Sequence, residues 1–161
     1  MSASVDGLLA RQAEVERRLV EHAARPLPSG LADPDPGGDE RWEAGQVWAH
    51  LAEFPAYWLA QAQRVVAQPT HSPVPFGRVK TDAGRLAAIE RDRHTDPQAL
   101  LDRVRSSLAE VNDAVRSWDD ETWRQRGMHP ARGEMTVEQI IDKFIASHLE
   151  EHADQLDSLH R

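Results

Sequence analysis

Four long segments of this chain repeat their apolar residues every three or four positions, which is the spacing that places side chains on one face of a helix. None of them alternates apolar and polar residues in the two-residue period of a half-buried strand. We therefore expect an all-α fold in which each helix buries its apolar face against the others, and we expect no strands. The segments are residues 5–19, 42–67, 97–118 and 136–159.

Local signals mark two of the expected helix starts. Asp96 followed by Pro97 combines an N-cap residue with a proline at the first helical position. Thr136, followed three residues later by Gln139, matches a capping box. A shorter helix is expected at about residues 82–91.

Loops rich in proline and glycine separate the helical segments, at residues 25–40, 68–77 and 119–135. The first of these loops is long enough to cross one end of a helical bundle. The chain has 161 residues and no internal repeat, which suits a single hydrophobic core. These features predict one domain over residues 1–161, a four-helix bundle with a long crossover connection.

Composition excludes several classes of function. The chain has no cysteine, so it can form neither disulfides nor thiolate metal sites, and it has no thiol nucleophile of its own. Its net charge is −8 and it has no basic run, which argues against a nucleic-acid partner. Residues 1–24 lack a continuous apolar stretch and contain several charges, so they predict neither a signal peptide nor a membrane span. We expect a cytoplasmic protein that acts on a small molecule.

Three histidines fall on apolar faces of the predicted helices. His148 and His152 are four residues apart, so their side chains project from one face about 5–6 Å apart. His50 lies on the second helical segment between Val47 and Phe54. If the second and fourth helices are antiparallel, all three imidazoles arrive at a similar height. Three imidazoles can bind one divalent ion and leave coordination positions open for chemistry.

Helical geometry supports this grouping. At 100° per residue, His148 points within about 20° of Ile141, and His152 lies about 40° further round. A buried polar side chain needs a partner, because leaving it unpaired costs about 1–3 kcal/mol. A metal site and a polar cluster in the core both meet that need, and both interpretations remain open. The other histidines lie at helix ends or in loops and are expected at the solvated surface: His22, His71, His94, His129 and His160.

Two side chains are candidates to orient the imidazoles through their second ring nitrogen. Glu53 follows His50 by three residues, and Gln155 follows His152 by three residues. Exposure to solvent is the alternative for Glu53. The sequence identifies no catalytic residue, since no cysteine and no evident Ser–His pair is present. The nucleophile must then come from another molecule, such as water.

The ordered set of these motifs resembles the DinB/YfiT-like superfamily over essentially the whole chain. It consists of Trp42 eight residues before His50, Gly133-x-x-Thr136, and His148-x-x-x-His152-x-x-Gln155. The resemblance implies a four-helix bundle, often dimeric, with a divalent metal on three histidines. The positions that match those ligands are His50, His148 and His152, and zinc or nickel is the expected ion, with iron as an alternative.

Characterised members of that family include transferases and isomerases that use low-molecular-weight thiols such as mycothiol and bacillithiol. The resemblance thus implies a metal-dependent thiol S-transferase acting on an electrophilic small molecule, and a homodimer. Arg126 and Arg132, in the loop before the fourth helix, are candidates to bind the thiol cosubstrate. Two alternatives stay open: a metal-dependent hydrolase that uses bound water, and a non-enzymatic bundle that binds a small molecule or dimerises.

Overall fold

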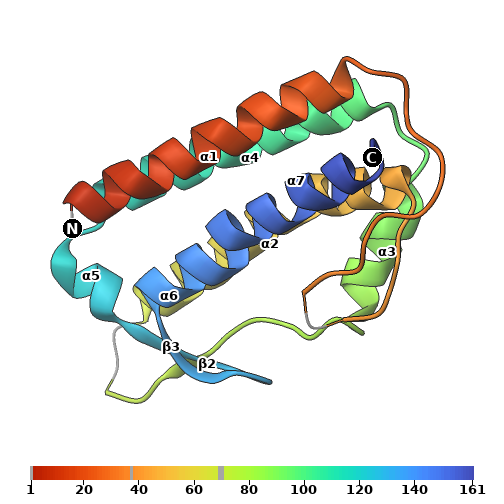
Figure 1. The fold of residues 1–161 in the computed structure, drawn as a ribbon. Coiled ribbons are helices and arrows are strands. Elements are labelled where there is room, and N and C mark those ends of the chain that lie inside the picture. The colour runs from red at the N-terminus through yellow and green to blue at the C-terminus, as the bar shows by residue number, and fades with distance from the viewer. Residues whose placement is uncertain (1, 37, 69–70) are drawn as a thin grey trace.

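A computed structural model of the chain describes residues 2–36, 38–68 and 71–161 (Figure 1). It contains the expected four-helix bundle. The long helices are α1 (Ser2–Ala23), α2 (Ala44–Ala67), α4 (Pro97–Ser117) and a fourth made end to end from α6 (Val137–Ile141), η1 (Asp142–Ser147) and α7 (His148–Ser158). Two short helices, α3 (Ala83–Asp92) and α5 (Asp120–Arg124), lie in the connections.

The bundle pairs its helices in an order that requires long connections. Both α1 and α2 pack against α4 and α7, so α1 and α2 lie diagonally opposite each other. The fourth helix runs antiparallel to α2 but parallel to α1, whose Arg11 contacts Asp142 and whose Arg18 contacts Asp154 further along (Figure 1). Because diagonally opposite helices cannot be joined by a tight turn, the connection from α1 to α2, described for residues 24–36 and 38–43, crosses one end of the bundle, which confirms the predicted crossover.

Local capping explains where these helices begin. The Asp96 side chain accepts a hydrogen bond from the Gln98 backbone N–H at the start of α4. Thr136 accepts a hydrogen bond from the Gln139 N–H, and the Gln139 side chain accepts one from the Thr136 N–H, which confirms the predicted capping box. A further capping box, between Glu43 and Gln46, begins α2 at Ala44.

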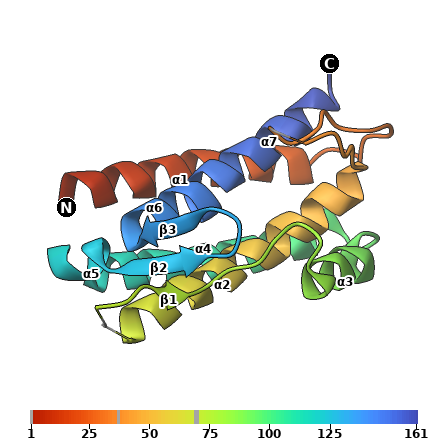
Figure 2. The ribbon, with the colours of Figure 1, turned by 90° about the horizontal axis from the view of Figure 1, so that it is seen from below.

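The expectation of a fold without strands is wrong for two of the loops. Strand β1 (Val74–Pro75) pairs in parallel with β2 (Arg126–His129), which pairs antiparallel with β3 (Gly133–Thr136) (Figure 2). Burial does alternate along β2, but its inward residues are Gly127 and His129 while Met128 faces outward. An apolar residue outside and polar or small residues inside give the sequence no strand pattern to recognise.

The fourth helix contains a π-helical segment, η1, directly before His148. A π turn closes its hydrogen bonds over five residues, so it holds one residue more than an α turn. The predicted alignment of Ile141 with His148 assumed an unbroken α-helix and is not met. Ile141 borders a cavity beside α1 and α5, whereas His148 borders a different cavity beside α2.

Arg11 on α1 contacts both ends of η1. Its guanidinium donates to Asp142 Oδ1 at 2.6 Å and to Ser147 Oγ at 3.2 Å, and it also binds the Glu150 carboxylate. The wide turn is therefore anchored to its parallel neighbour at the point where the helix reaches His148. In the part of the chain that the structure describes, no helix is long and apolar enough to cross a membrane.

Candidate metal centre

His50 from α2 meets His148 and His152 from α7 in the interior of the bundle. The Nε2 atom of His148 lies 3.0 Å from Nε2 of His50 and 3.2 Å from Nε2 of His152. His152 is fully buried and His50 nearly so, while His148 reaches the edge of a cavity. The structure thus brings together the three histidines that the sequence singled out.

The spacing of these nitrogens suits one bound ion. With metal–nitrogen bonds of about 2.0–2.1 Å, two ligand nitrogens lie about 2.9 Å apart at a right angle and about 3.3 Å apart at a tetrahedral angle. The observed 3.0 and 3.2 Å fall between these values, and the ligand atoms of all three histidines lie within 4.8 Å of one another. The donor set therefore fits a divalent cation, which His50, His148 and His152 would hold beside the cavity.

The outer nitrogens of the rings decide where the protons lie. Nδ1 of His50 donates to Glu53 Oε1 at 2.9 Å, and Nδ1 of His148 faces Glu151 Oε2 at 3.3 Å. Nδ1 of His152 donates to Gln155 Oε1 at 2.6 Å. Since each Nδ1 keeps its proton for an oxygen acceptor, all three Nε2 atoms present lone pairs to one another. Lone pairs facing each other repel, and a cation between them removes that repulsion.

Burial keeps these rings neutral. It lowers the pKa of His148 to about 3, and the positive charge of Arg85 acts in the same direction. It lowers the pKa of His152 to about 3 as well, assisted by His148. The pKa of His50 is also well below its ordinary value, because of burial and then its two histidine neighbours. Neutral imidazole is the form that binds metals, so no proton has to leave these rings near neutral pH.

Second contacts hold the oxygen acceptors in place. Glu53, which the sequence left between the site and solvent, is largely buried and also binds the Arg78 guanidinium. Burial raises the pKa of Glu53, and Arg78 opposes that shift. The Gln155 amide donates to the Asp33 carbonyl and to Asp35 Oδ1, both at 3.1 Å, which orients its oxygen toward His152.

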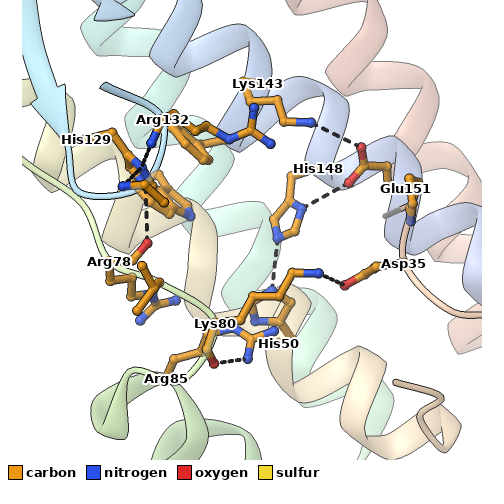
Figure 3. A pocket seen from close by; sticks show the side chains of 15 residues that line it. Asp35, His50, Arg78, Lys80, Arg85, His129, Arg132, Lys143, His148 and Glu151 are labelled. Carbon is orange, nitrogen blue, oxygen red and sulfur yellow. Dashed lines mark hydrogen bonds and ion pairs between the residues drawn. The ribbon is translucent and has the colours of Figure 1, made fainter. Parts of the chain in front are cut away.

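A cavity of about 370 Å³ opens beside His50 and His148 (Figure 3). Aromatic and basic side chains dominate its lining. Trp58 stacks on Phe144 with ring centres 4.0 Å apart, and Phe144 stacks on His129 at 5.0 Å. The charged lining residues are five bases and two acids: Arg78, Lys80, Arg85, Arg132, Lys143, Asp35 and Glu151. A protein with a net charge of −8 thus contains a locally positive cavity.

His129 joins two loops that form one side of this cavity. Its Nδ1 accepts the backbone N–H groups of Ala131 and Arg132, both at 3.1 Å, so its Nε2 carries the proton and donates to the Arg78 carbonyl at 3.2 Å. Gly77, with φ of +88°, allows the close approach, because a Cβ there would lie 2.7 Å from the His129 ring.

Two expectations about the remaining histidines are wrong. His129 is buried because the β2–β3 hairpin folds over the cavity. His22 is buried because the end of α7 covers it, with Asp157 Oδ1 at 2.7 Å from its Nε2 and the His160 ring stacked on it. His71, His94 and His160 are exposed as expected.

The structure separates the two arginines proposed for the cosubstrate. Arg132 lines the cavity, whereas Arg126 is not among its lining residues and pairs with Glu134 at 2.8 Å. The other bases of the lining were missed, and they come from residues 78–85 and from Lys143. No spacing rule connects Arg78, Lys80 and Arg85 to the histidines, since the connection after α2 and the first turn of α3 bring them there. Lys143 instead lies on the fourth helix, in η1, five residues before His148.

Comparison with known proteins agrees with the fold. A family model described as the DinB superfamily matches residues 12–156. Bacillus subtilis YfiT, described as a probable metal-dependent hydrolase with an unusual four-helix bundle topology, is similar with a TM-score of 0.77 at 18% identity. The similarity covers 98% of this chain and 86% of YfiT. A search of curated protein sequences finds no match.

Two structures of the mycothiol-dependent maleylpyruvate isomerase, one of them a histidine-to-alanine variant, are also similar. Each has a TM-score of 0.67, at 16% and 15% identity. The similarity covers 96% of this chain but only 61% of the isomerase, so the isomerase has a large part with no counterpart in this sequence.

Proposed function

Because this chain belongs to the DinB superfamily and gathers three neutral histidines at the base of a cavity, we propose that it is a metal-dependent thiol S-transferase. It would transfer a low-molecular-weight thiol to an electrophilic small molecule. His50, His148 and His152 would hold the ion, and Glu53 and Gln155 would orient the rings of His50 and His152. When bound, a divalent ion supplies Lewis acidity that lowers the pKa of a thiol or a water molecule.

One observation favours a borrowed nucleophile. Among the described residues that line the cavity there is no serine, threonine, tyrosine or cysteine, so this lining offers no hydroxyl or thiol for attack. Its two acidic lining groups already face cations, Asp35 with Lys80 at 3.9 Å and Glu151 with Lys143 at 3.8 Å. The five bases of the lining would stabilise an anionic nucleophile such as a thiolate. The protein's own residues would then bind and orient the thiol and the electrophile and exclude water from the cavity.

A metal-dependent hydrolase is the second candidate, and two observations favour it. The fold is similar to that of YfiT, which is described as a probable metal-dependent hydrolase. Glu151 borders the cavity beside His148 and is about one quarter exposed, so its carboxylate could accept a proton from an attacking water. The pairing of Glu151 with Lys143 weakens that role, which is why we place this function second.

Metal analysis followed by a thiol assay tests the proposal. Protein purified without a histidine tag should contain about one divalent ion per chain, and His152→Ala should lose it while the matched control His160→Ala, at an exposed position, keeps it. The zinc-loaded protein should then consume mycothiol or bacillithiol together with a haloalkyl electrophile.

Each other outcome has a defined meaning. Absence of metal after reconstitution would make the histidines a polar core cluster and overturn the proposal. Metal-dependent ester cleavage that needs no thiol would overturn the transferase in favour of the hydrolase.

A further inference from the structure

Arg85 is a buried cation that forms no direct ion pair among the described residues. Only 5% of the residue is exposed. The carboxylates of Glu40, Glu53 and Asp35 act on its charge, but none of their oxygens lies within ion-pairing distance of its guanidinium. Its contacts are a hydrogen bond of 2.8 Å from Nη1 to the Lys80 carbonyl and the face of Trp42, at 5.2 Å from the ring centre. Removing a charge from water without pairing it is unfavourable, so this arrangement calls for an anion.

The other bases of the cavity are in a different situation. Arg78 is also buried, but it is paired with Glu53, and Lys80 and Lys143 each face a carboxylate. Arg132 is exposed and solvated at the rim, with its guanidinium 5.8 Å from the centre of the Phe144 ring. Arg85 alone among these five combines burial with the lack of an acidic partner within the described structure.

Its position directs it toward the proposed site. Arg85 lines the same cavity as His50 and His148, on the side opposite Arg132 (Figure 3). Apart from Nη1, its guanidinium donors have no protein acceptor in the described structure, and they are not among the polar atoms sealed away from solvent. A planar guanidinium presents two parallel N–H groups that match the two oxygens of a carboxylate.

We propose that Arg85 binds a carboxylate of a small organic acid that lies against the three-histidine site. The role of this site in a reaction rests on the proposed function. The class of ligand is a molecule with at least one carboxylate and an organic part that packs on Trp58 and Phe144. The carboxylate can be supplied by the thiol or by the electrophile, and the recognition chemistry is the same for both.

Succinate is the probe, with its neutral diamide succinamide and inorganic phosphate as comparisons. Binding is followed through tryptophan fluorescence, because Trp42 lies under Arg85 and Trp58 lines the cavity. The titration is run on chelator-treated protein and again on zinc-loaded protein. We expect succinate to bind both forms and succinamide to bind neither. No succinate binding, or tighter binding of phosphate than of succinate, would overturn the proposal.

Substitutions then locate the binding residue. Arg85→Met, which keeps length without charge, should weaken succinate binding at least tenfold. Arg91→Met is the matched control, because Arg91 lies on the same helix, is exposed and pairs with Asp92 instead. Equal weakening in both variants, or none in Arg85→Met, would overturn the assignment. If Arg85→Met does not fold, the NMR resonance of the Arg85 side-chain Nε–H in the parent protein replaces it as the test. The resonance should shift when succinate is added, and an unchanged resonance would overturn the proposal.

This experiment separates the two proposals. Succinate binding to metal-free protein supports the carboxylate site even if no thiol transfer is ever detected, and transfer without succinate binding refutes the carboxylate site alone. In a working transfer assay, succinate that competes with the thiol, or with the electrophile, identifies which molecule brings the carboxylate. Competition with neither would count against the site.

Discussion

The base and the wall of the cavity are built in contrasting ways. At the base, His50, His148 and His152 project from two regular helices, are buried, and are neutral because burial lowers their pKa values. The charged wall comes mostly from residues 78–85 and from the β2–β3 hairpin, with Lys143 added from η1, and it is positively charged. Rigid, neutral ligands suit the binding of a metal ion, while a charged wall built largely from the connections between long helices suits selection among substrates.

Acidification is expected to have the largest effect, and it tests the base. Histidines in the unfolded chain have a pKa near 6.5. Below that pH the unfolded chain therefore binds protons that the folded, metal-free site does not bind. Stability should therefore fall with falling pH, by about 1.4 kcal/mol per pH unit for each such histidine, between pH 6.5 and pH 4. Urea unfolding of chelated protein at several pH values measures the slope.

Two variants isolate the contribution of one ring. His152→Gln should reduce the slope of unfolding free energy against pH by about 1.4 kcal/mol per pH unit, which corresponds to one proton fewer bound on unfolding. His94→Gln, at an exposed position, should leave the slope unchanged. Equal slopes in the two variants would mean that His152 is not held neutral in the folded protein.

Removing the charge of Glu53 should have the next largest effect and tests the junction of base and wall. Glu53 accepts from Nδ1 of His50 and also binds Arg78, so it belongs to both regions. Glu53→Gln should lower zinc affinity about 10- to 100-fold, which is the usual range for a group that orients a ligand imidazole. Competition with a chromophoric chelator measures it, and Glu90→Gln, an exposed residue, is the control. A change within twofold would show that Glu53 serves the wall alone.

His129→Phe should have the smallest effect and should affect only the wall. Phenylalanine can keep the stack on Phe144, but it loses the hydrogen bonds to Ala131, Arg132 and Arg78. Each lost hydrogen bond is worth about 0.5–1.5 kcal/mol, and water can replace part of that loss. The cavity wall should therefore be held less firmly, and succinate affinity should fall about three- to tenfold. Zinc affinity should be unchanged, and His71→Phe at an exposed loop position should change neither. Loss of zinc binding in His129→Phe would show that base and wall are not separable.

The same contrast explains what could be predicted from the sequence. His148 and His152 are related by the four-residue spacing of a helix, and Thr136 and Gln139 by a capping pattern, so local rules were sufficient for them. Arg85 reaches the cavity only because residues 71–96 return along the bundle, and no local rule describes that path. His129 was missed because β2 places polar and small residues inward, which reverses the pattern that marks a strand.

The π turn before His148 has a consequence for how the family can diverge. Because the wide turn already absorbs one extra residue, deleting one residue between positions 142 and 147 would let it close as an ordinary α turn without rotating the helix that follows. Converting the π turn to an α turn at unchanged length would instead rotate everything after it by about 100°. His148, His152 and Gln155 would then turn together away from His50, while a continuous helix would still fill the fourth position of the bundle. Substitutions that close the wide turn are thus a short evolutionary route from a metal-binding bundle to one that keeps the architecture without the ion.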